Sequence, residues 1–369
     1  MAVVTMIACN QRTKLPSGYR EYAYVSNGGS GTVSVLDLLT LKPAATVKVG
    51  KGPTGLAANP ARNEIYVVNT DSDNISIIDA ENNRAIGAVG VHHAPFAISV
   101  SADGKRAYVA NSGSANVSVL DLDSRTVLKN ISVGAAPGLA RVSPDGKIVV
   151  VSNRGDDTAS VIDTERMSVR STIPVCKQPE DIVILPSSEK AFISCSGSAQ
   201  VASIDVKNDK LLALLDVGRT PVSMALKPDG GELFVTNFDS QTVSTVETTT
   251  NEVAGSFLIG EHPARAVVSG DNSTLYVSNF GANSIAIFGI DMSKLLTTVA
   301  VGSRPEALAF SPNGVFLLVV DSQAGDVAVV RVTERQYGKL TSPAALYTTI
   351  PVGAQPRDIV VKAFISRNK

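Results

Sequence analysis

The chain repeats itself every 42 residues, and this period limits its fold more than any other feature of the sequence. The recurring segment reads YVVNTDSDNISIID at 66–79, YVANSGSANVSVLD at 108–121 and YVSNFGANSIAIFG at 276–289. The position that ends "YVxN" recurs eight times, as Asn27, Asn69, Asn111, Asn153, Cys195, Asn237, Asn279 and Asp321. An interval that stays constant over all eight copies indicates one structural unit repeated along the chain.

Each repeat carries four strand signals and no helical periodicity longer than a turn. In the third copy the signals are FAISVS, RAYVAN, VSVLD and VLKNISV, which are rich in Val and Ile. Tight-turn sequences such as SADG and SPDG separate the first two. Four-stranded units repeated at this spacing predict an all-β fold, a β-propeller of antiparallel blades in which neighbouring blades bury each other's faces.

The first copy begins at Tyr22 with its second strand, and the missing strand signal, PRDIVVKAF, lies at 356–364. We therefore expect eight blades, with the C-terminal strand completing the first blade and removing an open edge. Seven blades is the alternative, if the first copy is an appendage. The expected organisation is a tail or signal remnant at 1–20, one propeller domain at 21–365 and a short tail at 366–369.

The repeat consensus, VGxxP followed by PDGxxxYVxN and VSVID, resembles the YVTN-type β-propeller family over residues 22–365. The resemblance implies a protein found outside the cytoplasm or on the cell surface, and used in binding or protein interaction. Lactonase-like and haem d1-type eight-bladed propellers share parts of the pattern. The recurring Tyr, Phe and Val are expected to fill the core, and the recurring Asn to tie its strand to a neighbouring loop.

Composition argues against nucleic acid as a partner. Lys and Arg number 33 against 34 Asp and Glu, Trp is absent, and aromatic residues make up 5%, so neither a basic field nor stacking platforms are available. The N-terminal MAVVTMIACN ends an apolar run at Cys9 in the manner of a lipoprotein signal. We expect a periplasmic, extracellular or cell-surface protein, with Cys9 as the lipidation candidate and otherwise no membrane contact.

Positions that break the repeat are where function can have been added. Two breaks fall in one copy: Cys176 replaces the Gly of "VG", and Cys195 replaces the Asn of "YVxN". Antiparallel pairing of the first two strands places both at one rim of one blade. The pair is expected to form a disulfide, which would imply an oxidising compartment, or to remain two small buried thiols.

The three histidines, His92, His93 and His262, lie in loops that lead into innermost strands. Because the first two are four copies away from the third, we expect no shared metal site. They are either exposed loop residues or separate contacts to one central ligand, such as a haem-like macrocycle.

Charged residues gather near the start of the innermost strands, where they face the channel. These ligand-binding candidates are Glu180, Asp181, Arg265, Arg304, Glu306, Arg357 and Asp358. They predict either a site for a polar or anionic small molecule or a water-filled channel lined by paired charges. The loops after "YVxN" add rim candidates for a partner, Arg154, Asp156, Phe238 and Phe280.

The sequence thus favours a non-catalytic propeller that binds a protein or small ligand through its top face and channel mouth. The alternative is an enzyme whose site is at the channel mouth, either a lactonase-like hydrolase or a protein acting on a haem d1-type ligand. The sequence contains no motif typical of a cofactor or metal site, and we expect neither.

Overall fold

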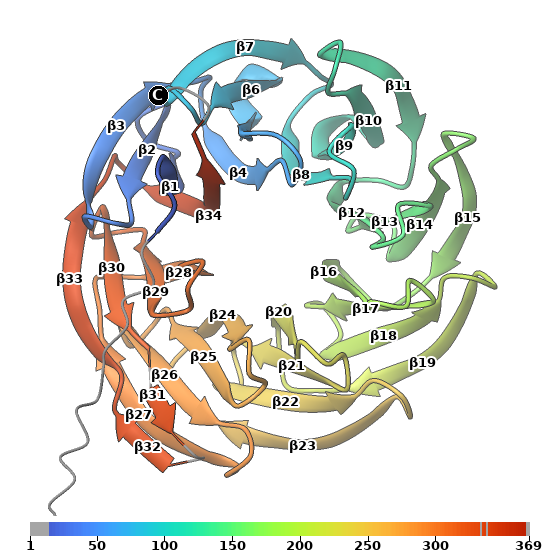
Figure 1. The fold of residues 1–369 in the computed structure, drawn as a ribbon. Coiled ribbons are helices and arrows are strands. Elements are labelled where there is room, and N and C mark those ends of the chain that lie inside the picture. Colours follow the sequence, from blue (N-terminus) through green and yellow to red (C-terminus); the bar gives the residue numbers. More distant parts are fainter. Residues whose placement is uncertain (1–14, 333, 337–338, 367–369) are drawn as a thin grey trace, which may run out of the picture.

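The Val- and Ile-rich segments of each repeat form four antiparallel strands, and eight such sheets close into a ring (Figure 1). This computed structural model describes residues 15–332, 334–336 and 339–366. Cys9 lies outside the described residues. We number the blades from the one that contains the N-terminal strand.

Within each blade the strands take four positions from the channel outward. The innermost strands are β34 (Pro356–Ile365), β4 (Pro53–Ala58), β8 (Pro95–Val100), β12 (Pro137–Val142), β16 (Pro179–Ile184), β20 (Pro221–Leu226), β24 (Pro263–Val268) and β28 (Pro305–Phe310). The second strands are β1 (Tyr19–Asn27), β5 (Glu64–Asn69), β9 (Arg106–Asn111), β13 (Ile148–Asn153), β17 (Lys190–Cys195), β21 (Glu232–Asn237), β25 (Thr274–Asn279) and β29 (Phe316–Asp321).

The third strands are β2 (Thr32–Asp37), β6 (Asn74–Asp79), β10 (Asn116–Asp121), β14 (Thr158–Asp163), β18 (Gln200–Asp205), β22 (Thr242–Glu247), β26 (Ser284–Gly289) and β30 (Asp326–Arg331). The outermost are β3 (Lys42–Lys48), β7 (Arg84–Gly90), β11 (Thr126–Ser132), β15 (Ser168–Pro174), β19 (Lys210–Asp216), β23 (Glu252–Leu258), β27 (Lys294–Ala300) and β33 (Ala345–Pro351). The insertion in the last repeat holds the hairpin β31 (Glu334–Gln336) and β32 (Lys339–Ser342), and two short 3-10 turns are η1 (Thr70–Ser72) and η2 (Ser112–Ser114).

The chain closes its ring through its two ends. Strand β1 pairs with β34 in register from Tyr19 opposite Ile365 to Asn27 opposite Pro356. The first blade therefore consists of the C-terminal strand and the first three strands of the chain. This confirms eight blades rather than seven, because the first repeat is an integral blade and not an appendage.

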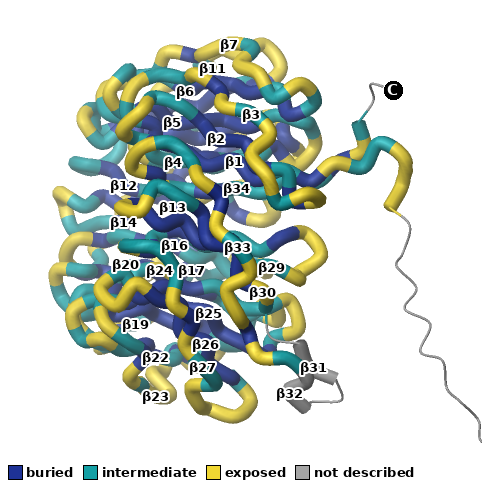
Figure 2. The backbone as a smooth tube through the Cα atoms, turned by 90° about the vertical axis from the view of Figure 1, so that its left-hand side faces the viewer, coloured by how far each residue is buried: buried dark blue, intermediate teal, exposed yellow. Residues whose placement is uncertain are grey.

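Buried residues lie mainly on the strands inside the ring (Figure 2), and their side chains form cores between neighbouring blades. Tyr66 and Val68 of blade 2, for example, pack with Ile98 and Val109 of blade 3. Recurring aromatic side chains of the second strands are almost completely buried: Tyr24, Tyr66, Tyr108, Phe192, Phe234 and Tyr276. Because one blade cannot cover both of its faces, the ring is what makes each blade stable.

In two blades the recurring Asn bonds to the neighbouring loop, as the sequence predicted: Gly353 N donates to Asn27 Oδ1, and Asn279 Nδ2 donates to Ile259 O, both at 3.1 Å.

In the regular arrangement the Asn also holds the second strand to the third strand of its own blade. Asn69 Nδ2 donates to Asn74 Oδ1 at 2.8 Å and to Ser76 Oγ at 2.9 Å. The Gly of "VG" packs directly on it, since a Cβ on Gly50 would lie 2.7 Å from the Cβ of Asn69. We call this Gly, the Asn and the acceptor five residues later the clasp of a blade.

The two faces of the ring are built from different loops. On the upper face, loops into the innermost strands bond to loops between second and third strands, as when Gly113 N donates to His93 O. The lower face carries the turns between first and second strands and those between third and fourth. The candidate ligand and partner residues thus gather on the upper face and along the channel.

Candidate functional site at the upper face and channel

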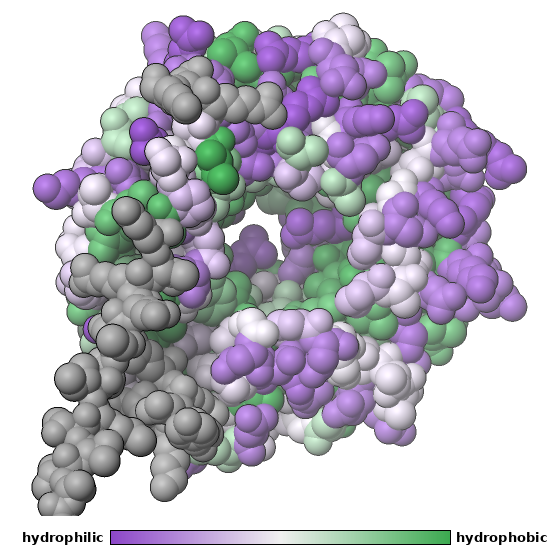
Figure 3. All heavy atoms as spheres, viewed as in Figure 1, coloured by the Kyte–Doolittle hydropathy of each residue, from purple (hydrophilic) through white to green (hydrophobic). Residues whose placement is uncertain are grey.

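The channel is open through the ring, and hydrophilic side chains are visible inside it (Figure 3). Each innermost strand begins with a buried Pro, and a bulge follows it in the pairing with the second strand, as between Pro179 and Ile182. The residues in the bulge are released from regular pairing. Their side chains are therefore available for contacts to the next blade or to the channel.

Arg154 connects three blades. Its Nη2 lies 3.0 Å from Glu180 Oε2 of blade 5, and its Cζ lies 4.4 Å from the ring centroid of Phe96 in blade 3. Gly138 makes room for the guanidinium, because a Cβ there would lie 2.5 Å from Arg154 Nε. Ser196 Oγ donates to the other oxygen of Glu180 at 3.2 Å. This rim candidate and this ligand candidate are thus partners of each other.

A second charge pair joins blades 1 and 8. Arg357 Nη1 lies 3.7 Å from Glu306 Oε1. Both residues directly follow the first Pro of their innermost strands, so adjacent blades contribute opposite charges at the mouth. Like Arg154 and Glu180, these two side chains form an ion pair between blades.

Asp181 and Asp358 brace the ring. Asp181 accepts hydrogen bonds from Ile182 N at 2.9 Å and from Met224 N of the next blade at 2.9 Å. Asp358 repeats this at the opposite side of the ring, with Ile359 N at 2.9 Å and Leu56 N at 2.8 Å. Each carboxylate therefore links two innermost strands, a structural role that the sequence analysis missed.

Two arginines face these acids from other blades. Arg141 Nη2 lies 3.8 Å from Asp181 Oδ1. Burial raises the pKa of Asp358, and the hydrogen bond from Leu56 together with the charges of Arg265 and Arg141 opposes that rise. The exposed guanidinium of Arg265 makes no hydrogen bond or ion pair with the residues the structure describes. It is the channel cation most available to a ligand.

The three histidines do not converge. The ring nitrogens of His92 lie 2.7 Å from Asn116 Nδ2 and 3.0 Å from Asn130 Nδ2, which places His92 over the outer strands of blade 3 rather than at the channel mouth. His93 Nδ1 lies 3.2 Å from Asp73 Oδ1 and is largely exposed. Within the described part of the chain, no group of three or more His, Cys, Asp or Glu could hold a metal ion.

His262 belongs to an aromatic and cationic row on the upper rim. Its ring stacks on Phe238 with centroids 4.5 Å apart, and Phe238 lies 6.0 Å from Phe280. Arg304 Cζ lies 5.4 Å from the centroid of Phe280. We call these four residues, contributed by blades 6, 7 and 8, the rim row.

Acidic side chains of the rim loops accept hydrogen bonds from backbone N–H groups of the adjoining loops. Asp156 accepts a hydrogen bond from Ala135 N, and Asp157 Oδ1 accepts one from Gln178 N at 2.9 Å. Asp73 Oδ1 accepts from Ala94 N at 2.8 Å. These bonds join the two kinds of upper-face loop, which explains why acids recur there.

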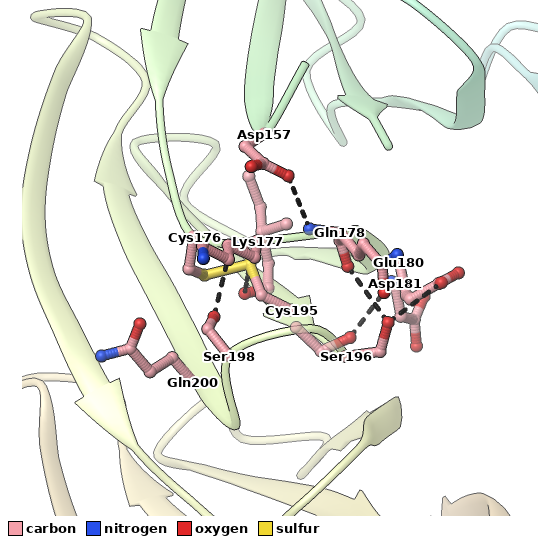
Figure 4. Close-up of a disulfide and its surroundings, with 12 residues drawn as sticks. Asp157, Cys176, Lys177, Gln178, Glu180, Asp181, Cys195, Ser196, Ser198 and Gln200 are labelled. Carbon is pink, nitrogen blue, oxygen red and sulfur yellow. Dashed lines mark hydrogen bonds between the residues drawn. A yellow bond between two sulfur atoms is a disulfide. The ribbon is translucent and has the colours of Figure 1, made fainter. Parts of the chain in front are cut away.

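The disulfide candidates occupy the clasp of blade 5 (Figure 4). Cys176 and Cys195 are bonded, with their Cα atoms 5.6 Å apart. Both are buried, and Cys195 packs with Val161 and Ile193 in the core between blades 4 and 5. Since Gly and Asn already touch in the regular clasp, replacing both by Cys brings two sulfur atoms within bonding range.

Two family models match parts of the chain. One, described as "Lactonase, 7-bladed beta-propeller", matches residues 239–354, and the other, "YNCE-like beta-propeller", matches residues 17–142. Each spans less than half of the chain. They support a β-propeller family, but not the YVTN-type repeat by name. No curated protein matches the sequence.

Solved structures share the fold at low identity. Dihydro-heme d1 dehydrogenase NirN in complex with DHE aligns with a TM-score of 0.74 at 15% identity, over 94% of this chain and 77% of that one. Kuenenia stuttgartiensis hydrazine synthase aligns at 0.60 and 21%, over 72% and 91%. A functionally unknown protein from Desulfotomaculum acetoxidans aligns at 0.63 and 14%, over 92% and 98%. These likenesses show the fold alone.

Among the residues described, no helix combines the length and the apolarity needed to cross a membrane.

Proposed function

We propose that this protein is an exported or cell-surface binding propeller that takes a protein partner or small ligand on its upper face. The observation that carries the proposal is the pairing of charges around an open channel. Arg154 with Glu180 and Arg357 with Glu306 neutralise each other between blades. A hydrolytic or redox site would need reactive groups that converge on one point, whereas these groups stabilise the mouth of a scaffold.

The rim row is the surface we assign to the partner. Phe238, Phe280 and His262 offer flat faces, and Arg304 adds an exposed cation. Aromatic and Arg side chains are enriched in protein interfaces because they bury much area at little entropic cost. A partner with flat or apolar groups and an anionic group would fit this row.

The disulfide supports an oxidising location for this function. Disulfides persist in secreted, periplasmic and surface proteins and are rare in reducing compartments. The bond between buried Cys176 and Cys195 is accordingly in keeping with export.

Affinity capture from the envelope fraction of the host, quantified by mass spectrometry, tests the proposal. The baits are wild type, the rim variant F238A/R304A and the control L212A, which removes a half-exposed apolar side chain from outer strand β19. We expect at least one protein to be captured equally by wild type and L212A and about tenfold less by the rim variant. Native mass spectrometry of the purified protein detects a small ligand instead. Equal capture by all three baits and a bare mass would overturn the proposal.

A lactonase-like hydrolase is the second candidate, favoured by the family model that matches residues 239–354. That range contains Arg265, Arg304 and Glu306. Wild type and R265A would be assayed on a panel of lactones of different ring size. Turnover by wild type that R265A abolishes would favour this candidate, and no turnover on any lactone would remove it.

Chemistry on a haem d1-type ligand fits the residues present less well. His92 is engaged by Asn116 and Asn130, His93 by Asp73, and His262 by Phe238. His92 or His93 would have to give up its polar partners to act as an axial ligand, whereas the contact of His262 is ring stacking. The likeness to NirN, at 15% identity, extends only to the fold.

A further inference from the structure

The lower face contains a cavity of about 420 Å³ between blades 7 and 8. Its lining includes Asp271, Thr274 and Tyr276 of blade 7 and Phe310, Ser311 and Val332 of blade 8. It lies on the face opposite the rim row, so nothing in the proposed function uses it.

At four other junctions, a cationic side chain of one blade donates to the same backbone carbonyl of the next. Arg62 Nη1 donates to Leu122 O at 2.8 Å, and Arg106 Nη1 donates to Thr164 O at 2.8 Å. Arg170 donates to Val206 O, and Lys190 Nζ donates to Thr248 O at 2.6 Å. The four acceptors are 42 residues apart, and the next two positions in this series are Ile290 and Val332.

Among the described residues, no cationic side chain donates to the corresponding carbonyl, Val332 O, at the junction of blades 7 and 8. Arg106, Lys190 and Thr274 occupy the same position of their repeats, directly before the apolar core of the second strand. Thr274 is almost fully buried and too short to reach the next blade. In the part of the chain that the structure describes, the space beside Val332 that corresponds to the guanidinium or ammonium group of the other junctions belongs to the cavity.

The residues around Arg106 have counterparts at equivalent repeat positions in the lining of the cavity. Hydrogen bonds from Ser101 and Lys105 lower the pKa of Asp103, and the charge of Arg106 adds to this effect. Burial raises the pKa of Tyr108, and Arg106 opposes that rise. The residues that correspond to Asp103, Tyr108 and Thr164 are Asp271, Tyr276 and Val332, and all three line the cavity.

Asp271 supplies a charge at the cavity. Ser269 Oγ donates to its Oδ1 at 2.5 Å and Ser273 Oγ to its Oδ2 at 2.8 Å. Burial acts to raise the pKa of Asp271, but these hydrogen bonds outweigh it and hold the pKa below its usual range. The carboxylate is therefore charged at neutral pH. Tyr276 and Phe310 meet edge to face, with centroids 5.5 Å apart, and add aromatic surface that attracts cations.

We propose that the cavity binds an organic cation, a guanidinium or primary ammonium group on a short apolar chain, in the place that Arg106 occupies between blades 3 and 4. The cation would bond to Val332 O and pair with Asp271, while its chain would lie against Tyr276 and Phe310. The volume suits a ligand of side-chain size. An Arg or Lys side chain of a peptide and a free amine share this chemistry.

Ligand-observed NMR titration tests the proposal with n-butylguanidinium, n-butylammonium and uncharged n-butylurea. Wild type is expected to bind the two cations at least tenfold more tightly than the urea. T274R, which supplies the missing cation, should lose this binding more than tenfold while its circular dichroism stays unchanged. D271N should weaken cation binding about tenfold, so that the proposal can be judged even if T274R does not fold.

The reverse change is the sharper control. R106T should open an equivalent cavity between blades 3 and 4 and raise the number of bound cations from one to two. Comparing butylguanidinium with the peptide acetyl-Gly-Arg-Gly-amide identifies the source of the natural cation. Tighter binding of the peptide would assign the site to a side chain of a protein partner. Equal binding would assign it to a free amine. Equal affinity of wild type for butylurea and the cations, or unchanged cation binding by T274R, would overturn the proposal.

Discussion

Blades 5 and 8 hold the same point of their sheets by different chemistry. In the regular clasp an amide, such as that of Asn69, donates to the third strand. Blade 5 replaces the clasp by the Cys176–Cys195 bond. Blade 8 keeps Gly302 but places Asp321 opposite Asp326, so two carboxyl groups meet where other blades have an amide and its acceptor.

The three versions respond to different conditions. An amide clasp depends on neither redox state nor pH, whereas the disulfide depends on the first and the acid pair on the second. Burial, together with the neighbouring Asp326, raises the pKa of Asp321 to about 8. The comparison shows that this end of the second strand is held by an amide in one blade, by a disulfide in another and by an acid pair in a third, and each version can be tested by mutation.

Removing the disulfide should have the largest effect. The bond closes a loop of sequence separation 19, and C176A/C195A is expected to lower the free energy of unfolding by about 3 kcal/mol. C176G/C195N rebuilds the clasp and should recover about 1 kcal/mol, since the introduced amide would find an acceptor at Gln200 but only Ala202 in place of the usual Ser.

Urea unfolding followed by circular dichroism measures both variants. Reductant should lower the stability of wild type to that of C176A/C195A and leave the two variants unchanged. If reductant left the urea midpoint of wild type unchanged, the disulfide of blade 5 would not contribute to stability.

Filling the Gly of the blade 8 clasp should have the next largest effect. A Cβ on Gly302 would lie 2.6 Å from Asp321 Oδ2 and 2.7 Å from its Cβ, so G302A should destabilise the protein by about 1–3 kcal/mol. The matched control is G255A on outer strand β23, where a Cβ would meet no atom within 4 Å. It should change the stability by less than about 0.5 kcal/mol. Equal effects of the two changes would show that the clasp is not tightly packed.

Restoring the amide of blade 8 should have the smallest effect and the clearest pH dependence. The native state keeps a proton on Asp321 that the unfolded chain releases near pH 4. Its contribution to stability is therefore complete below pH 4 and is lost as the pH rises through about 8. D321N should remove this decline and stabilise the protein by about 1 kcal/mol at pH 8.

Thermal unfolding between pH 5 and 9 measures the difference between wild type and D321N. The two curves should meet at low pH and separate as the pH rises. Parallel curves would show that Asp321 does not hold its proton in the native state.

The 42-residue period determined the number of blades, the closure by residues 356–364 and the pair of positions at which two cysteines meet. These features depend on contacts within one blade, which every copy of the repeat encodes in the same way. A local pattern seen eight times is therefore sufficient to predict them.

Only the tertiary structure shows which contacts are made by the residues that depart from the repeat. Asp181 and Asp358, expected to face a ligand, brace neighbouring innermost strands, and His92 turns toward the outer strands. The cavity depends on Thr274 and Val332, which ring geometry brings together from different blades. Such contacts depend on side-chain direction and on the blade alongside, and neither is encoded in the spacing of the repeat.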